Sequence, residues 1–278
     1  MTAEHEEPAG PRPQSLMLTF LGDYLYDRDL CVFSGSVIDA LGRLGVSEHA
    51  TRSTLTRMVN RGLLRRQKHG RRMYFGLTRR TAEILRDGHT RIWRTGAVND
   101  DWDGDWTLLG FSLPEAWQRQ RHDLRAKLAW AGFGPLQGGL WIAPGHVRVD
   151  DIVASLGLEA HVRVFRATVD EPTDVGQLVG DAYDLGPIAA GYRSFLDRWA
   201  DSQPYPEDPL AAHLSIVTEW LRIIRKDPRL PVRHLPEDWP ANPAQKAFRD
   251  IEGTLSRPAA EIAAELLDTV PDGSPFSE

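Results

Sequence analysis

"TRSTLTRMVNRGLLRRQKHGRRMYFGLT", residues 51–78, is a strongly basic segment in a chain whose formal net charge is −6. Between Ser47 and Arg80 the chain has ten Lys and Arg side chains against a single acid, Glu48. Residues 11–94 carry 16 Lys and Arg against 7 Asp and Glu, whereas residues 95–278 carry 17 against 29. This asymmetry predicts a module that binds a polyanion, joined to a part with a different role.

The first half of the segment has the pattern of a recognition helix. Ser47 is a typical N-cap and Gly62 a typical stop, so we expect a helix from Ser47 to about Arg61. Helical periodicity places four side chains on one buried face: Thr51, Leu55, Met58 and Val59. The opposite face and its edges carry polar side chains: Ser53, Thr56, Arg57, Asn60 and Arg61.

These outward side chains are of the types that read DNA bases. Arg binds guanine in a bidentate manner, Asn binds adenine in the same way, and Ser or Thr can contact either base. Arg52 lies beside the apolar face in the first turn, so we expect it to contact a phosphate or to support the fold. The helix is therefore predicted to enter the major groove.

The second half, residues 63–78, predicts two strands around a tight turn at His69-Gly70, with Met73 and Phe75 alternating on the return strand. Its tip is basic and comprises Lys68, His69, Arg71 and Arg72. Cations placed in this way bind the DNA backbone or the minor groove, where the negative potential is strongest. The hairpin is therefore a predicted DNA-binding wing.

Two further helices precede the recognition helix. Residues 15–25 are apolar enough for a buried helix, and residues 33–45 predict a second one, with Ser34 or Ser36 as N-cap and Gly45 as stop. Together they give the outline of a winged helix-turn-helix. A solvated basic face on an ordinary helical domain is the plain alternative. We favour double-stranded DNA over RNA or another polyanion because three features all fit a winged helix that binds DNA. They are the order of the helices, the polar side chains on the outer face and the basic hairpin.

The rest of the chain predicts an α+β protein of several domains. A length of 278 residues suggests two or three domains. We expect the winged helix at 13–95, a ferredoxin-like α+β domain at 102–172, where strands and helices alternate, and a helical effector or dimerisation domain at 181–270. Tyr192 and Trp220 lie on apolar stripes of the last part, which fit either core packing or a pocket or dimer surface.

Several classes of protein are disfavoured by the sequence. No apolar run is long enough to span a membrane, and residues 1–10 have no signal-peptide pattern. The single cysteine, Cys31, excludes an internal disulfide. We therefore expect a cytoplasmic protein. The acidic stretch 100–105 has Ser112 where an EF-hand needs a Glu. We find no P-loop, no metal site and no catalytic constellation, so neither a cofactor nor an enzyme is expected.

Six segments in a fixed order resemble the PaaX-like family of transcriptional regulators, which repress phenylacetic acid degradation. They are "SLMLTFLGDYL", "RSTLTRMVNRGLL", "GRRMYFGLT", "WTLLGFSLPE", "RHDLRAKLAWAGFGPLQGGLWIAP" and "RLPVRHLPEDWP". The resemblance implies a winged helix, a central Cas2-like domain and a helical C-terminal domain. It also implies a bacterial homodimeric repressor that binds a palindromic operator and is relieved by an acyl-CoA effector related to phenylacetyl-CoA.

Two alternatives remain beside this hypothesis. The Cas2 likeness raises a metal-dependent nuclease, although such enzymes place a metal-binding Asp at the end of the first strand, where this chain has Gly110, Phe111 and Ser112. The other alternative is an architectural DNA-binding protein without an effector. We match no effector-binding residues to this sequence.

Overall fold

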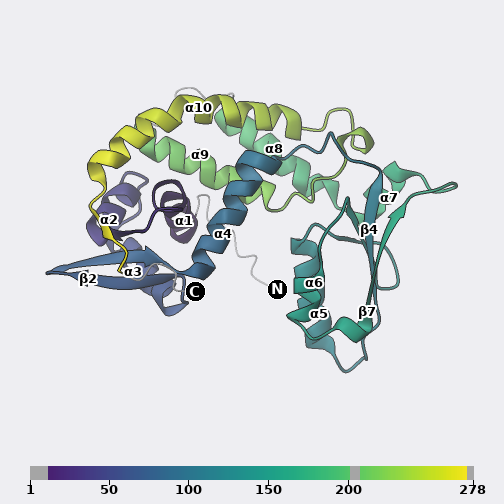
Figure 1. The fold of residues 1–278 in the computed structure, drawn as a ribbon. Coiled ribbons are helices and arrows are strands. Elements are labelled where there is room, and N and C mark those ends of the chain that lie inside the picture. The colour runs from purple at the N-terminus through teal and green to yellow at the C-terminus, as the bar shows by residue number, and fades with distance from the viewer. Residues whose placement is uncertain (1–11, 201–206, 274–278) are drawn as a thin grey trace, which may run out of the picture. The chain divides into compact units, whose positions relative to one another are not determined.

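The computed structural model describes residues 12–200 and 207–273, and its contacts divide the chain into two compact units (Figure 1). The first unit contains the chain up to Arg94, Asp197–Leu221 and the residues from Lys246 onward. The second unit contains Thr95–Leu196 and Arg222–Gln245. The three helices α8 (Leu185–Trp199), α9 (Pro209–Ile224) and α10 (Ala241–Leu266) are therefore each divided between the two units.

The first unit has the element order of a winged helix-turn-helix. Its N-terminal elements are α1 (Pro13–Tyr24), β1 (Leu30–Phe33), α2 (Ser34–Gly42), α3 (Glu48–Asn60), β2 (Leu64–His69), β3 (Arg72–Leu77) and α4 (Arg79–Thr90). A π-helical turn, Arg91–Thr95, follows α4. The C-terminal strand β8 (Thr269–Pro271) also belongs to this unit.

The sheet of the first unit has the strand order β2-β3-β1-β8. Neighbouring strands of this sheet are antiparallel, with Val32 opposite Phe75 and Leu30 opposite Pro271. Neither β1 nor β8 was expected from the sequence, because each is too short to show an alternating pattern of its own. The expected caps of α2 were wrong: the N-cap is Phe33, and Ser34 and Ser36 lie buried within the helix.

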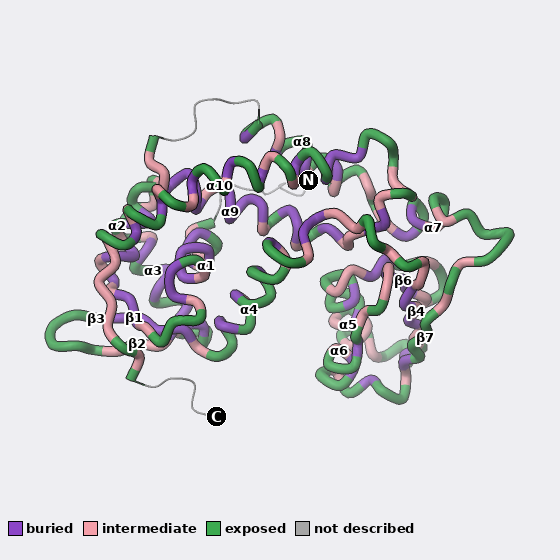
Figure 2. Tube along the Cα trace, turned by 45° about the horizontal axis from the view of Figure 1, so that its top comes forward, coloured by how far each residue is buried: buried purple, intermediate pink, exposed green. Residues whose placement is uncertain are grey.

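The core of the first unit joins the winged helix to the C-terminal helices. Met17 and Phe20 of α1 are fully buried in the same cluster as Leu55 of α3. That cluster also contains Leu210 and Leu214 of α9, together with Ala259 and Ala263 of α10. Most of α9 is buried, and Figure 2 shows α1 and α9 largely in the colour of buried residues. The winged helix therefore shares one core with helices from the far end of the chain.

The second unit contains an antiparallel sheet of ferredoxin-like topology, as expected. Its elements are β4 (Asp105–Phe111), α5 (Gln118–Trp130), β5 (Gly134–Pro135), β6 (Leu140–Pro144), α6 (Asp150–Ala154), β7 (Val162–Thr168) and α7 (Val175–Ala182), with 3-10 turns at Glu159–His161 and Val232–His234. The strand order β5-β6-β4-β7 is the ferredoxin-like order, because β4 and β6 are central and β5 and β7 are the edges.

Both faces of this sheet carry a core. Leu109 and Trp141 pack with Leu124 and Leu128 of α5 on one face. On the other face, Trp106 and Ile142 pack with side chains of α7 and with Leu230. No helix in the described ranges of the chain is long and apolar enough to cross a membrane.

Candidate nucleic-acid interface

Helix α3 presents a polar outer face, as its periodicity predicted. The Ser47 hydroxyl accepts a hydrogen bond from the Ala50 backbone N–H at 3.2 Å, which caps the helix. Thr51, Leu55 and Met58 are buried and Val59 is half-buried. The predicted site residues of this helix are all exposed: Arg52, Ser53, Thr56, Arg57, Asn60 and Arg61. Their contact with DNA stays a prediction.

Local hydrogen bonds orient two of these arginines. Arg57 donates through Nη2 to the hydroxyl of buried Thr54 at 3.0 Å, and this hydroxyl in turn donates to the Ala50 carbonyl at 2.8 Å. Arg52 donates through Nε to the Glu48 carboxylate at 2.7 Å, one turn earlier. Arg57 therefore has an anchored guanidinium on the outer face, whereas part of the charge of Arg52 is neutralised on its own helix.

The wing is the hairpin of β2 and β3, and its turn lies one residue later than expected. His69 pairs with Arg72, so Gly70 and Arg71 form the two-residue loop. Gly70 has φ 59°, a left-handed conformation that suits glycine at the first central position of such a loop. The four predicted wing residues, Lys68, His69, Arg71 and Arg72, are exposed. Met73 is exposed as well, because the strand leaves the core near the tip.

Arg66 is a candidate that the sequence reasoning missed. Its guanidinium lies 3.5 Å from the Thr56 hydroxyl, to which it donates, so the side chain bridges the wing and the recognition helix. Alternation along β2 could have identified it, since Leu64, Arg66 and Lys68 share one face and Leu64 is buried in the core beside α3. Arg66 therefore joins the predicted DNA-binding surface.

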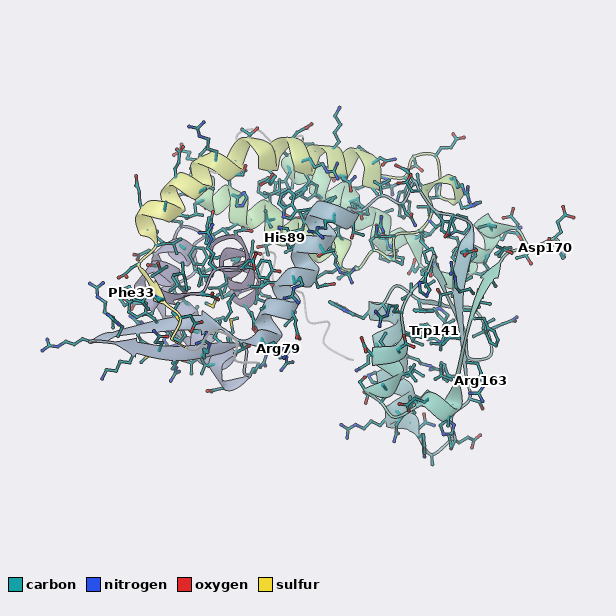
Figure 3. The ribbon with its side chains drawn as sticks, viewed as in Figure 1. Phe33, Arg79, His89, Trp141, Arg163 and Asp170 are labelled. Carbon is teal, nitrogen blue, oxygen red and sulfur yellow. The ribbon has the colours of Figure 1, made fainter. Side chains whose placement is uncertain are left out.

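Arg72 differs from the other predicted wing residues because it is already paired. Its Nη1 lies 2.5 Å from Oδ2 of Asp268, and its guanidinium carbon lies 5.0 Å from the centre of the Phe33 ring. Figure 3 labels Phe33, which lies where the C-terminal segment reaches the sheet. Asp268 also accepts a hydrogen bond from the Tyr74 hydroxyl at 3.0 Å. The charge of Arg72 is thus partly neutralised by the C-terminal end of the chain.

The second unit holds a buried polar cluster at the C-terminal end of α9. The Tyr192 hydroxyl donates to the Asp227 carboxylate, whose other oxygen accepts from the Arg229 backbone N–H at 2.7 Å. Burial raises the pKa of Asp227 and also that of Tyr192. The apolar stripes expected in the C-terminal helices are buried, as at Phe195 of the second unit and Trp220 of the first unit, and so form core.

The end of β4 offers no carboxylate to a metal. Phe111 ends the strand and Ser112 follows it. Among the residues that the structure describes, no three or more His, Cys, Asp or Glu side chains are grouped so as to hold a metal ion.

Three family models match successive parts of the chain. The model "PaaX-like protein" matches residues 12–81, "PaaX protein central Cas2-like domain" matches 99–179, and "PaaX-like protein C-terminal domain" matches 183–265. The transcriptional repressor PaaX of Escherichia coli (strain K12) is 26% identical over 270 residues, which are 92% of this chain and 84% of that protein.

A solved structure supports the fold. It is that of an uncharacterized protein from Mycobacterium tuberculosis, which aligns with a TM-score of 0.61 over 90% of this chain and 98% of its own. The sequence identity is 23%.

Proposed function

Because this chain belongs to the PaaX-like family, we propose that it is a sequence-specific transcriptional repressor that acts by binding double-stranded DNA. The observation that carries the proposal is the exposed polar face of α3 beside the basic wing. A relative from Escherichia coli, matched over 92% of this chain, is itself a transcriptional repressor. In this proposal the chain acts by binding and not by catalysis.

The proposed reading surface is the outer face of α3. Arg57, held by Thr54, would contact a guanine, and Asn60 one turn further would contact an adenine. Lys68, His69 and Arg71 at the wing tip would bind the backbone, with Arg66 between the two elements. In a homodimer, two such helices would enter successive major grooves of a palindrome with half-sites about 10 bp apart, or a multiple of that.

The proposed control is an acyl-CoA effector that relieves repression, as the family resemblance implies. A ligand weakens DNA binding only by binding the free protein more tightly than the DNA-bound one. A tenfold effect requires a coupling free energy of about 1.4 kcal/mol.

Substitution of Arg57 tests the proposal most directly. DNA fragments selected from the source genome supply an operator, and binding to it and to scrambled DNA is then measured at several salt concentrations. Arg57→Ala should cost roughly 1–3 kcal/mol on the operator and relax the preference at one base pair of each half-site. Arg71→Ala should weaken all sequences similarly and reduce the salt slope by about one.

Arg79→Ala is the matched control, because it removes one exposed arginine whose partner is Glu83 on α4. Operator binding by Arg57→Ala as tight as that of the wild type would refute the assignment of this face. Footprints without a palindrome would favour the architectural alternative, and Mg²⁺-dependent cleavage would favour the nuclease. Operator binding that is unaffected by a panel of aryl- and alkyl-CoA thioesters would remove the effector from the proposal.

A further inference from the structure

The C-terminal strand β8 is an integral part of the sheet that forms the wing. It pairs antiparallel with β1, where Cys31 lies opposite Val270. Just before the strand, the Asp268 carbonyl accepts from the Phe33 N–H at 2.8 Å, and the Asp268 N–H donates to the Ser36 hydroxyl at 3.0 Å. Figure 1 shows this last part of the chain, in yellow, running from the end of α10 to the hairpin.

The segment brings two carboxylates to the wing, one near its tip and one near its base. Asp268 pairs with Arg72, whose side chain is 61% exposed, and Asp272 pairs with Arg65. Gln67 on β2 fixes the same segment, because its side-chain amide donates to the Pro271 carbonyl at 3.1 Å and accepts from the Gly273 N–H. These contacts anchor the C-terminal segment to β2.

Arg72 is placed where it could otherwise contact DNA. It directly follows Arg71, the second residue of the turn, and therefore lies at the tip of the wing. Its side chain shares a sheet face with Tyr74, opposite to the face of Arg66 and Phe75. Residues 63–78 contain five Lys and Arg, so pairing Arg65 and Arg72 with aspartates neutralises a substantial part of the charge of the hairpin. Affinity for the DNA backbone rises with each cation that neutralises a phosphate.

We propose that β8 is a restraint on DNA binding built into the fold, in which Asp268 withholds Arg72 from the phosphate backbone. The inference rests on the proposed DNA-binding function. Asp268 is one of the two residues that connect α10, which ends at Leu266, to β8.

The variant Asp268→Asn tests the restraint, since Asn keeps the size of the side chain and an oxygen for the Tyr74 hydroxyl. Because the ion pair is exposed, its release should tighten binding to operator and non-specific DNA alike by roughly 1.4- to 5-fold. One more phosphate contact should steepen the slope of log K against log salt by about 0.9. Binding is measured by fluorescence anisotropy of a labelled duplex between roughly 50 and 200 mM salt.

Two further variants separate charge from structure. Tyr74→Phe removes the other side-chain partner of Asp268 without changing any charge, so its salt slope should equal that of the wild type. In the double variant Asp268→Asn/Arg72→Ala, the slope should return to the wild-type value. A double variant that keeps the steeper slope would overturn the proposal, because the gain would then not come from Arg72.

The remaining outcomes are equally decisive. If Asp268→Asn and Tyr74→Phe both weaken binding with unchanged slopes, Asp268 has only a structural role and the restraint is refuted. A wild-type protein that binds no DNA refutes the proposed function itself. A wild-type protein that binds its operator, with an Asp268→Asn slope no steeper, refutes the restraint alone.

Discussion

Leu214→Ala is expected to destabilise the DNA-binding unit although the substitution lies far from the winged helix in sequence. Leu214 is fully buried on α9, in the same cluster as Met17 and Phe20 of α1. The change removes three carbons from a packed core, which costs about 2.7–5 kcal/mol where the surrounding side chains relax only partly into the gap. Since urea lowers the free energy of unfolding by about 1–3 kcal/mol per molar, the midpoint should fall by roughly 1 M or more.

The assay follows operator binding and tryptophan fluorescence through a urea titration. Ser215→Ala is the control, because this neighbouring side chain is small and half-buried, so its midpoint should stay near that of the wild type. If Leu214→Ala keeps the wild-type midpoint for loss of DNA binding, α9 does not support the winged helix and the shared core described above is wrong.

Two further predictions concern other parts of the fold. Gly134→Ala should lower the stability of the second unit by about 1–3 kcal/mol, because the added Cβ would collide with the Ala182 carbonyl and lie 2.9 Å from the Tyr183 ring. Thermal unfolding measures this loss, and an unchanged melting temperature would contradict the packing. Burial raises the pKa of Asp208, but hydrogen bonds from the Ala211 N–H and from Arg43 outweigh it and leave the pKa below its usual value. A carboxyl group whose pKa is lower in the folded state than in the unfolded state stabilises the folded protein at pH values above the unfolded-state pKa, which is about 3.9. This contribution disappears as the pH falls through the folded-state pKa. Asp208→Asn, which keeps a capping side chain but loses the ion pair, should therefore cost up to about 1 kcal/mol at neutral pH, and this difference should disappear as the pH falls through the folded-state pKa of Asp208. A difference that persists in strong acid would refute the assignment.

The recognition helix could be predicted because its signals are local. Ser47 and Gly62 mark its two ends, and the spacing of Leu55 and Met58 identifies the buried face without reference to any other part of the chain. The ferredoxin-like unit could be predicted for a similar reason, since the alternation of strands and helices restricts the topology to a few arrangements. The exposure of Arg57 and Asn60 follows directly from the helical period.

The missed features depend on partners far away in the sequence. The strand β8 has three residues, and only its pairing with β1 makes it a strand. Asp268 lies 196 residues from Arg72, so no local pattern could show that the two are paired. Leu210 and Leu214 show that α9 is apolar, but a helix that is apolar on several sides fits any core. The shared core therefore became visible only in three dimensions.

The position of β8 has a practical consequence for work with this protein. Strand β8, which ends at Pro271, is an edge strand of the sheet that forms the wing. Two residues later, the Gly273 N–H donates to the side chain of Gln67. A purification tag or fluorescent label inserted directly after Gly273 would therefore follow this sheet at once. A charged tag, such as polyhistidine, would alter the local electrostatic field at the wing. Affinities measured with C-terminal fusions should therefore be compared with those of an N-terminally tagged or cleaved protein.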